Sequence, residues 1–328
     1  MKEEEIRKRD IFNKYLKLVE KDVKRYFDFK FFKKIACPAC DGKVVKNELE
    51  KNGFEYVSCK NCATLFVSPR PSFEELRDFY SESPSTSFWV SKFFKPVMEI
   101  RRKKIFIPRA KYISKILRSK RRYIIGDIGA GFGLFLEELR KISPAGDYVA
   151  IEPSREMIDI CEKKGLRVRH SCLENVSGMD GQFDLLTAFE MIEHLYDPVI
   201  FLKKVHSLLR PGGHIFFTVL NGKGFDVLLL WEKSKMIIPP LHLNLFNPKS
   251  IRCLLERIGF EIIEISTPGK LDWDIVEGMI KSEGVVPDRF WMTLAQESDS
   301  RCKVELQDWI SRNNLSSHMR VLAKKPNK

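Results

Sequence analysis

The amino-acid sequence predicts an α/β protein whose main part is a doubly wound, mostly parallel sheet of seven strands, preceded by a small N-terminal unit built around cysteines. From Tyr123 onward, short apolar or β-branched runs alternate with segments of helical spacing. This alternation is typical of a parallel sheet covered by helices on both faces. A glycine-rich stretch directly follows the first of these runs, and four of the eight cysteines are gathered between Cys37 and Cys62.

The chain of 328 residues is long enough for one large core and a smaller accessory unit. We expect a helical leader over 1–34, the cysteine unit over 35–75, a basic helical linker over 76–122, and the main domain over 123–328 with a lid segment at 222–247. The first ten residues, MKEEEIRKRD, carry no apolar signal core, and the longest apolar runs are too short to span a bilayer. We therefore expect a cytoplasmic protein in a reducing compartment.

The leader is predicted to be a helix because apolar residues recur at regular intervals between charged ones. They are Phe12, Leu16, Val19, Val23 and Phe27. This spacing places them on one face of a helix, which we expect to pack against the body of the protein.

The clustered cysteines form two CxxC pairs, Cys37 with Cys40 and Cys59 with Cys62, separated by eighteen residues. This spacing is typical of a zinc ribbon, in which two turns each offer two thiolates and a hairpin brings the turns together around a tetrahedral Zn²⁺. Four incidental free thiols are the alternative, and a redox CxxC is disfavoured because the motif is duplicated and opens no helix after a strand. Four thiolates leave no open coordination position, so we expect the zinc to be structural.

The net charge of +13 is concentrated in residues 92–122, where thirteen Lys or Arg stand with a single acid, Glu99. Charge gathered in this way favours an anionic partner, although a solvated basic helix is the alternative. The pattern predicts one or two helices broken near Pro108, with cationic clusters at 101–104 and 120–122. Its aromatic residues stand at positions expected on the buried side of helices: Phe93, Phe94, Phe106 and Tyr112.

Seven segments of the main domain are predicted to be strands: YIIGDI, YVAI, LRVRH, FDLLTAF, HIFFTVL, FEIIEIS and HMRVLA. Helical spacing lies between them at 133–142, 154–164, 197–209 and 248–258. Because strands and helices alternate, the sheet is expected to be parallel.

The stretch after the first strand reads DIGAGFG and leads into a helix that begins LFLEEL. A glycine-rich turn between strand and helix lets a ligand approach the backbone at the carboxyl edge of the sheet. A dinucleotide fingerprint would need a third glycine where this sequence has Leu134, so an adenosine ligand without phosphates fits better. The second strand ends in Glu152 and Pro153, where a carboxylate can accept hydrogen bonds from both ribose hydroxyls.

The fourth strand runs into EMIEHL, and a later helix ends in LLRPGG. Together with DIGAGFG, IEP, FDLLTAFEMIEHLYDP and HLNLFNPKSIRCLLERIGFE, these motifs stand in the order expected of one family. Residues 120–265 resemble the class I S-adenosylmethionine-dependent methyltransferases, in particular the branch of ubiquinone-pathway O-methyltransferases and bacterial sugar methyltransferases. The cysteine unit followed by FVSPRPSFEELRDFY resembles the N-terminal zinc module of sugar methyltransferases. The resemblance implies a Rossmann-like fold and S-adenosylmethionine as the cofactor.

The resemblance also implies which residues bind this cofactor. They are Asp127, Gly129, Ala130, Gly131, Glu152, Pro153, Cys172, Leu173 and Phe189. The glycine loop would line the methionine and ribose parts with Asp127 beneath it, Glu152 would hold the ribose diol, and Phe189 would lie against the cofactor. Relatives often place an aspartate where this sequence has Cys172, so the backbone groups of Cys172 and Leu173 are expected to recognise the adenine.

Methyl transfer from a sulfonium is an in-line displacement with a neutral leaving group, so the protein mainly has to align the nucleophile, the methyl group and the sulfur. A hydroxyl acceptor still needs a base, and histidine is the natural one near pH 7. His194 follows the fourth strand and His242 lies in PPLHLNLF, so both are candidates for the catalytic base. The alternatives are a capping or structural role for His194 and a lid-anchoring role for His242, and Glu193 is expected to stabilise the fold.

The sequence therefore favours an S-adenosylmethionine-dependent methyltransferase that acts on a small anionic acceptor, a nucleotide-linked or phosphorylated sugar in polysaccharide or glycoconjugate biosynthesis. One alternative is an RNA methyltransferase that uses the zinc ribbon and the basic segment, although no recognisable RNA-binding module accompanies them. Another is a catalytically silent binding module, against which the intact glycine loop argues. The sequence disfavours a nucleic-acid partner without excluding one, predicts no membrane span, and leaves a homodimer open.

Overall fold

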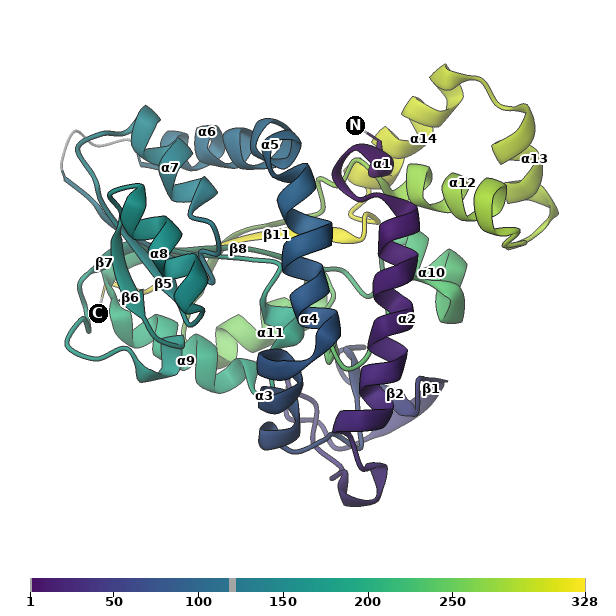
Figure 1. Ribbon diagram of the computed structural model, residues 1–328, viewed down its shortest axis with the longest axis horizontal. Coiled ribbons are helices and arrows are strands. Elements are labelled where there is room, and N and C mark those ends of the chain that lie inside the picture. The colour runs from purple at the N-terminus through teal and green to yellow at the C-terminus, as the bar shows by residue number, and fades with distance from the viewer. Residues whose placement is uncertain (1, 118–121, 328) are drawn as a thin grey trace. The chain divides into compact units, whose positions relative to one another are not determined.

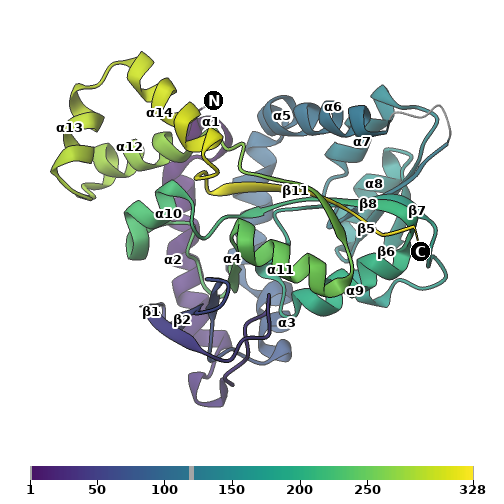
Figure 2. The same cartoon turned by 180° about the vertical axis from the view of Figure 1, so that it is seen from behind.

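The computed structural model describes residues 2–117 and 122–327 (Figures 1 and 2). Lys120 and Arg121, which belong to one of the cationic clusters, lie outside the described residues. The chain forms two compact units. The first unit comprises Met1–Val97, Val219–Ile251 and Ser266–Met319, and the second unit comprises Met98–Thr218, Arg252–Ile265 and Arg320–Lys328.

The α-helices of the described residues are α1 (Glu3–Ile6), α2 (Arg9–Tyr26), α3 (Phe73–Glu82), α4 (Pro84–Phe88), α5 (Met98–Arg101), α6 (Ile107–Ile116), α7 (Leu134–Ile142), α8 (Arg155–Lys163), α9 (Pro198–Leu208), α10 (Phe225–Leu230), α11 (Pro248–Ile258), α12 (Asp272–Glu283), α13 (Arg289–Glu297) and α14 (Ser300–Arg312). The strands are β1 (Val45–Lys51), β2 (Phe54–Cys59), β3 (Leu65–Val67), β4 (Ile124–Ile128), β5 (Asp147–Glu152), β6 (Arg167–His170), β7 (Phe183–Phe189), β8 (Leu209–Leu220), β9 (Asn244–Leu245), β10 (Glu261–Ser266) and β11 (His318–Lys324). Across both described stretches, none of these helices combines the length and the apolar character needed to cross a membrane.

A seven-stranded sheet has the order β10-β11-β8-β7-β4-β5-β6. The neighbours β4 and β5, β4 and β7, β5 and β6, and β7 and β8 run parallel. The prediction of a doubly wound, mostly parallel sheet of seven strands is therefore confirmed. From β4 the chain proceeds outward through β5 and β6, then returns to the other side of β4 with β7 and β8. The carboxyl ends of β4 and β7 thus form the switch point at which such sheets bind ligands.

One part of the core of the second unit lies between the sheet and helices α6 and α7. Buried side chains of β4, β5, β7 and β8 pack with side chains of α6 and α7, while α9 lies on the opposite face of the sheet (Figures 1 and 2). Strand β7, with the sequence FDLLTAF, is buried along all but its last residue. A strand covered on both faces is expected to be apolar throughout rather than alternating.

The first unit contains a four-stranded sheet of order β1-β2-β3-β9. Its neighbouring strands pair antiparallel, so the hairpin predicted between the two cysteine pairs is present as β1 and β2. The predicted leader helix is present as α2, which buries Phe12, Val19 and Val23 in the hydrophobic core that also contains side chains of this sheet. The helix ends at Tyr26, so the prediction was too long at its C-terminal end.

The basic segment differs from the prediction at Pro108. No break occurs there, because Pro108 occupies the first turn of α6, where the missing backbone N–H costs no hydrogen bond. The preceding turn, Arg102–Phe106, is a π-helical turn that joins α5 to α6. A wider turn relieves the crowding that the proline ring causes in the preceding turn of an α-helix.

The first unit also buries two neighbouring carboxyl groups, Asp226 and Asp272. Asp272 accepts hydrogen bonds from Ser316 Oγ at 2.7 Å and from Gln307 Nε2 at 2.7 Å. Among the described residues, neither oxygen of Asp226 has a hydrogen bond of normal geometry, although the nearby Ser317 hydroxyl lowers its pKa. Burial, and then the charge of Asp272, raise the pKa of Asp226 to about 7.

This raised pKa predicts how the stability of the protein depends on pH. The folded chain holds a proton at Asp226 that the unfolded chain, with its ordinary aspartate, releases near pH 4. The resulting stabilisation is complete below that pH and is lost as the pH rises through about 7. Asp226→Asn cannot lose this proton, so its free energy of unfolding relative to wild type should rise by about 2–3 kcal/mol between pH 5 and pH 8.

Denaturant unfolding at the two pH values measures the difference. Asp10→Asn, which alters an exposed carboxylate of the same unit, is the control and should follow the wild-type pH dependence. Parallel pH curves for Asp226→Asn and wild type would show that Asp226 folds in its charged form.

Candidate functional site

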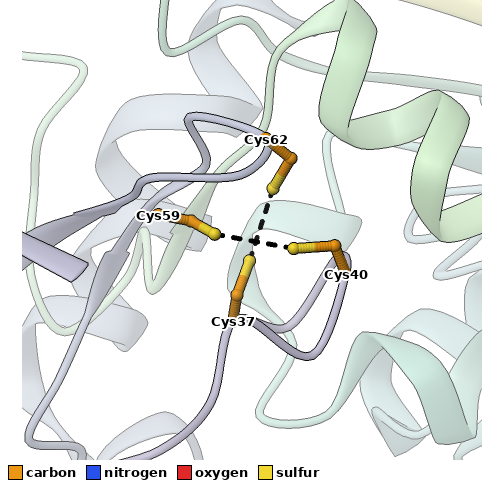
Figure 3. Close-up of side chains that lie close together, drawn as sticks. All are labelled: Cys37, Cys40, Cys59 and Cys62. Atoms are coloured by element: carbon orange, nitrogen blue, oxygen red, sulfur yellow. Dashed lines mark hydrogen bonds between the residues drawn. The ribbon is translucent and has the colours of Figure 1, made fainter. Parts of the chain in front are cut away.

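The four clustered cysteines point toward one another (Figure 3). Their sulfur atoms all lie within 4.8 Å of one another, with 3.5 Å between Cys37 and Cys62 and 3.5 Å between Cys40 and Cys59. Four thiolates around one zinc at about 2.3 Å would lie about 3.8 Å apart, so the arrangement fits a tetrahedral metal site. The structure thus brings together all four predicted ligands, and the cluster is compatible with zinc.

The two cysteine turns have the same local geometry. The N–H of Asp41 donates to the carbonyl of Cys37 at 2.9 Å, and the N–H of Ala63 donates to the carbonyl of Cys59 at 2.8 Å. Asp41 and Ala63 both have left-handed backbones, with φ of 61° and 57°. A left-handed alanine is unfavourable by about 1 kcal/mol, which indicates that the turn is held by its surroundings.

The thiols of this cluster differ in pKa. The hydrogen bond between Cys37 and Cys62 lowers the pKa of Cys62 and raises the pKa of Cys37. The lowered pKa of Cys62 favours its thiolate, which is the form that binds a metal.

The glycine loop after β4 is tied to the end of β5. The N–H of Gly129 donates to the carbonyl of Ile151 at 2.9 Å. At Gly133, an added Cβ would meet Leu166 at 2.7 Å, so this glycine is needed for packing. At Gly131, which has a φ of 52°, an added Cβ would meet no atom within 4 Å. The loop therefore keeps open space beside Gly131, which is where a ligand can approach the backbone.

Two carboxyl groups stand at this loop. Glu152 at the end of β5 is 8% exposed, and its two oxygens accept hydrogen bonds from the N–H of Gly131 at 2.9 Å and of Ser154 at 3.0 Å. Asp127 in β4 is buried and accepts a hydrogen bond from Thr187 at 2.6 Å. Burial raises the pKa of Asp127 to about 7 against the opposing effects of Thr187 and Arg109.

The remaining residues of the predicted cofactor site lie at the ends of neighbouring strands. Pro153 follows β5, and its carbonyl accepts a hydrogen bond from His170 at 2.9 Å. After β6, Cys172 is exposed and Leu173 is buried. Phe189 ends β7 and packs against Phe135 of α7 with ring centroids 4.8 Å apart, and Ala130 packs beside them.

One functional candidate was missed by the sequence reasoning. Arg109 of α6 donates to Glu190 at 2.8 Å and to Thr218 at 3.2 Å, and its guanidinium lies 4.5 Å from the ring centroid of Phe189. Glu190 directly follows β7 and has a φ of 51°, an unfavourable backbone that its bonds to Thr218 and Arg109 hold in place. Burial lowers the pKa of Arg109, and the nearby carboxylates of Glu190 and Asp127 act in the opposite direction. Nothing in the sequence distinguishes Arg109 from the other cations of the basic segment.

The two candidate bases fall in different units. His194 belongs to the second unit, in a short turn after β7 that also buries Glu193. His242 belongs to the first unit, where its Nδ1 lies 2.6 Å from the carbonyl oxygen of Met236. A carbonyl oxygen can only accept, so Nδ1 carries the proton and Nε2 is the basic nitrogen of His242.

Comparison with known proteins agrees with this geometry. A family model described as a methyltransferase domain matches residues 98–265, just over half of the chain. The ubiquinone biosynthesis O-methyltransferase of Coxiella burnetii is 31% identical over 119 residues, which cover 34% of this chain and 50% of the relative. The enzyme of the same name from Methylocella silvestris is 34% identical over 121 residues, covering 35% of this chain and 45% of the relative. The chain thus spans about half the length of these curated relatives.

Two solved structures are similar to part of this chain. The plantazolicin methyltransferase BpumL in complex with SAH is 18% identical, with a TM-score of 0.49, and the match covers 76% of this chain and 94% of that one. A SAM-dependent methyltransferase from Thermotoga maritima, described as a possible histamine N-methyltransferase, is 16% identical with a TM-score of 0.48, covering 72% and 96%. The segment matched by the family model holds the glycine loop, Glu152 and the switch point of the sheet. The chain therefore belongs to the methyltransferase-domain family.

Proposed function

We propose that this chain is an S-adenosylmethionine-dependent methyltransferase. We further propose that it transfers the methyl group to an oxygen of a small anionic acceptor, of the class of nucleotide-linked or phosphorylated sugars used in polysaccharide or glycoconjugate biosynthesis. The observation that carries the cofactor half of the proposal is the open space beside Gly131, next to the carboxylate of Glu152. The names of the curated relatives support oxygen as the methylated atom. The likeness of the cysteine unit to the zinc module of sugar methyltransferases supports the acceptor class.

S-adenosylmethionine, when bound, supplies an electrophilic methyl group on a positively charged sulfur. We assign the methionine and ribose parts to the loop of Gly129, Ala130 and Gly131, above Asp127. Glu152 would accept hydrogen bonds from the ribose hydroxyls, because each carboxylate oxygen keeps a lone pair beside its present backbone donor. A carboxylate already held by two N–H groups loses little freedom on binding, so this acceptor is preorganised.

We assign the rest of the proposed cofactor site to residues at or just after the ends of β5, β6 and β7. Phe189 would lie against the cofactor, held in place by the guanidinium of Arg109 and the ring of Phe135. Backbone groups of Cys172 and Leu173 would face the adenine, next to Pro153. In this arrangement Arg109 is a positioning residue, since it acts through Phe189 and Glu190.

The basic segment favours a small anion over RNA. Recognition of single-stranded RNA needs aromatic side chains that are free to stack on bases. Here Phe93 is buried, and Phe106 and Tyr112 pack against the core of the second unit. Among the cations, Arg102 is bound by three carboxylates: Glu99, Glu137 and Glu138. Lys103 and Lys111 are exposed and make no ion pair with the described residues, which leaves enough charge for one or two phosphates.

The acceptor hydroxyl must lose its proton during transfer, and a neutral histidine is suited to take it. We propose His242 or His194 for this role. The hydrogen bond to Met236 keeps the basic Nε2 of His242 in a fixed tautomer, which favours His242. A catalytic base of this kind contributes about 10²–10⁴-fold to the rate.

We further propose that Cys37, Cys40, Cys59 and Cys62 hold one structural Zn²⁺. The supporting observations are the closed set of four sulfur ligands and the repeated geometry of the two turns. Cysteines that bind a metal instead of forming disulfides are typical of a reducing compartment, so we place the protein in the cytoplasm.

Incubation with methyl-labelled S-adenosylmethionine tests the acceptor class. We expect label in at least one member of a panel of nucleotide sugars and sugar phosphates, as a stable ether with the mass of one added methylene, and none in bulk RNA. Gly131→Val should transfer no label, because valine fills the open space and disfavours the positive φ. Label in RNA alone would replace this proposal by an RNA methyltransferase, and label in neither would reject the acceptor class.

A further inference from the structure

The segment Leu241–Asn247, which carries His242, belongs to the same sheet as the cysteine ribbon. Its strand β9 pairs with β3, and the N–H of Val67 donates to the carbonyl of Leu243 at 2.9 Å. Strand β3 begins three residues after Cys62, so the metal-binding turn leads directly into the strand that holds this segment.

Two buried side chains of the ribbon bind the same segment. The hydroxyl of Tyr56 donates to the carbonyl of His242 at 2.7 Å. Arg70 donates to the side chain of Asn244 at 2.7 Å and to the carbonyl of Leu243 at 3.3 Å. Tyr56 is fully buried and Arg70 is 3% exposed. Water does not compete freely at such sites, so these bonds fix the backbone on both sides of the His242 ring.

A further contact joins the segment to the metal-binding turn itself. Asn247, which is 2% exposed, donates from Nδ2 to the carbonyls of Cys62 at 3.1 Å and Ala63 at 2.8 Å. Its Oδ1 accepts hydrogen bonds from the N–H groups of Lys249 at 3.0 Å and Ser250 at 3.1 Å, which caps α11. One amide therefore connects the second cysteine pair, the end of the His242 segment and the start of a helix.

We propose that a metal ion at the four cysteines acts as a positioning element for the segment Leu241–Asn247, and through it for His242. Bound metal fixes the turn of Cys59 to Cys62, which presents the carbonyls of Cys62 and Ala63 to Asn247 and continues into β3. Loss of the metal removes what holds Ala63 in its left-handed backbone, and the segment loosens. The consequence for methyl transfer rests on the proposed function, which places His242 on the acceptor side.

Asn247→Asp tests this coupling without removing a metal ligand. Aspartate keeps the oxygen that caps α11 but replaces the donor by a second oxygen, which faces two carbonyls. We expect an unchanged metal content and at least roughly tenfold faster amide hydrogen exchange in the peptide covering 236–250. Lys60→Gln is the matched control, because Lys60 lies between the same two cysteines with an exposed side chain and should leave exchange as in wild type.

Metal removal from the wild-type chain with a zinc chelator forms the second arm. Amide hydrogen exchange should become faster in residues 236–250 and 65–70, while exchange in the peptide covering 124–152 should change less than twofold. The affinity for S-adenosylmethionine should stay at the wild-type value. Unchanged protection of 236–250 after metal loss, or in Asn247→Asp, would overturn the proposal. These measurements need no acceptor, so they test the positioning role of the metal independently of the proposed acceptor class. With an acceptor in hand, Asn247→Asp should lower kcat/KM for it while leaving cofactor binding unchanged.

Discussion

Glu152→Ala should lower the affinity for S-adenosylmethionine by at least roughly 100-fold. Two hydrogen bonds from ribose hydroxyls to a charged acceptor contribute about 3 kcal/mol in a site of this kind. The substitution also removes the acceptor for the N–H of Gly131, so the loop loses one of the contacts that fix it to the end of β5. Both effects act on cofactor binding in the same direction.

Titration calorimetry with S-adenosylmethionine measures this change, with thermal unfolding in parallel to show that the variant is folded. Glu152→Gln is the informative partner, because it keeps the shape of the side chain but turns one acceptor oxygen into a donor that opposes the N–H of Gly131 or of Ser154. Its affinity should lie between those of wild type and Glu152→Ala. Glu162→Ala, which changes an exposed carboxylate at the end of α8, should bind like wild type. Binding of NAD, or wild-type affinity in Glu152→Ala, would contradict the assignment of Glu152.

Most of the sheet could be predicted because a parallel strand covered on both faces leaves a continuous apolar run. The run FDLLTAF is buried almost throughout, and the neighbouring strand β4 is buried along all but its first residue. Strand β9 left no such signal, since it has two residues and exists only through its pairing with β3. Helix α12 was not predicted because it buries residues on several sides, including Trp273, Ile275 and Gly278, which removes the one-sided periodicity of a surface helix.

Helices α13 and α14 did carry a signal that sequence reasoning can use. Asp288 accepts a hydrogen bond from the N–H of Trp291, and Asp299 accepts one from the N–H of Cys302, so each aspartate caps the helix that follows it. Capping residues ahead of an amphipathic stretch would have placed both helices.

Some residues of the candidate site could likewise be predicted from the sequence, and others could not. The cysteine cluster and the glycine loop depend on short spacings within the chain, and such spacings are visible in the sequence. Arg109 and Glu190 depend on a contact between α6 and the end of β7, which only folding creates. The strained backbone of Glu190 was likewise invisible, because glutamate has no intrinsic preference for positive φ. The attachment of His242 to the ribbon follows from the pairing of β3 with β9 and could not be predicted for the same reason.

Cys59→Ser should lower the zinc content from one per chain to a small fraction of that value and destabilise the first unit by several kcal/mol. Structural tetrathiolate zinc contributes about 10–16 kcal/mol to the folding of small modules, and three remaining ligands with a serine hydroxyl retain only part of it. Cys59 is 2% exposed at the end of β2, so serine also places a hydroxyl among buried sulfur atoms. The loss should not stay within the ribbon, because β9 and the chain around His242 belong to the same sheet.

Elemental analysis of protein purified without chelator, together with thermal unfolding, measures both parts of this prediction. Cys302→Ser in α14 is the matched control, since it changes a cysteine of the same unit that lies outside the cluster and should keep full zinc and wild-type stability. Binding of S-adenosylmethionine to Cys59→Ser should stay within a few-fold of wild type, because the glycine loop and Glu152 belong to the second unit. Wild-type protein without metal would refute the zinc assignment. A Cys59→Ser variant that loses zinc yet keeps its stability would show instead that the hairpin and the helix packing hold the ribbon without the metal.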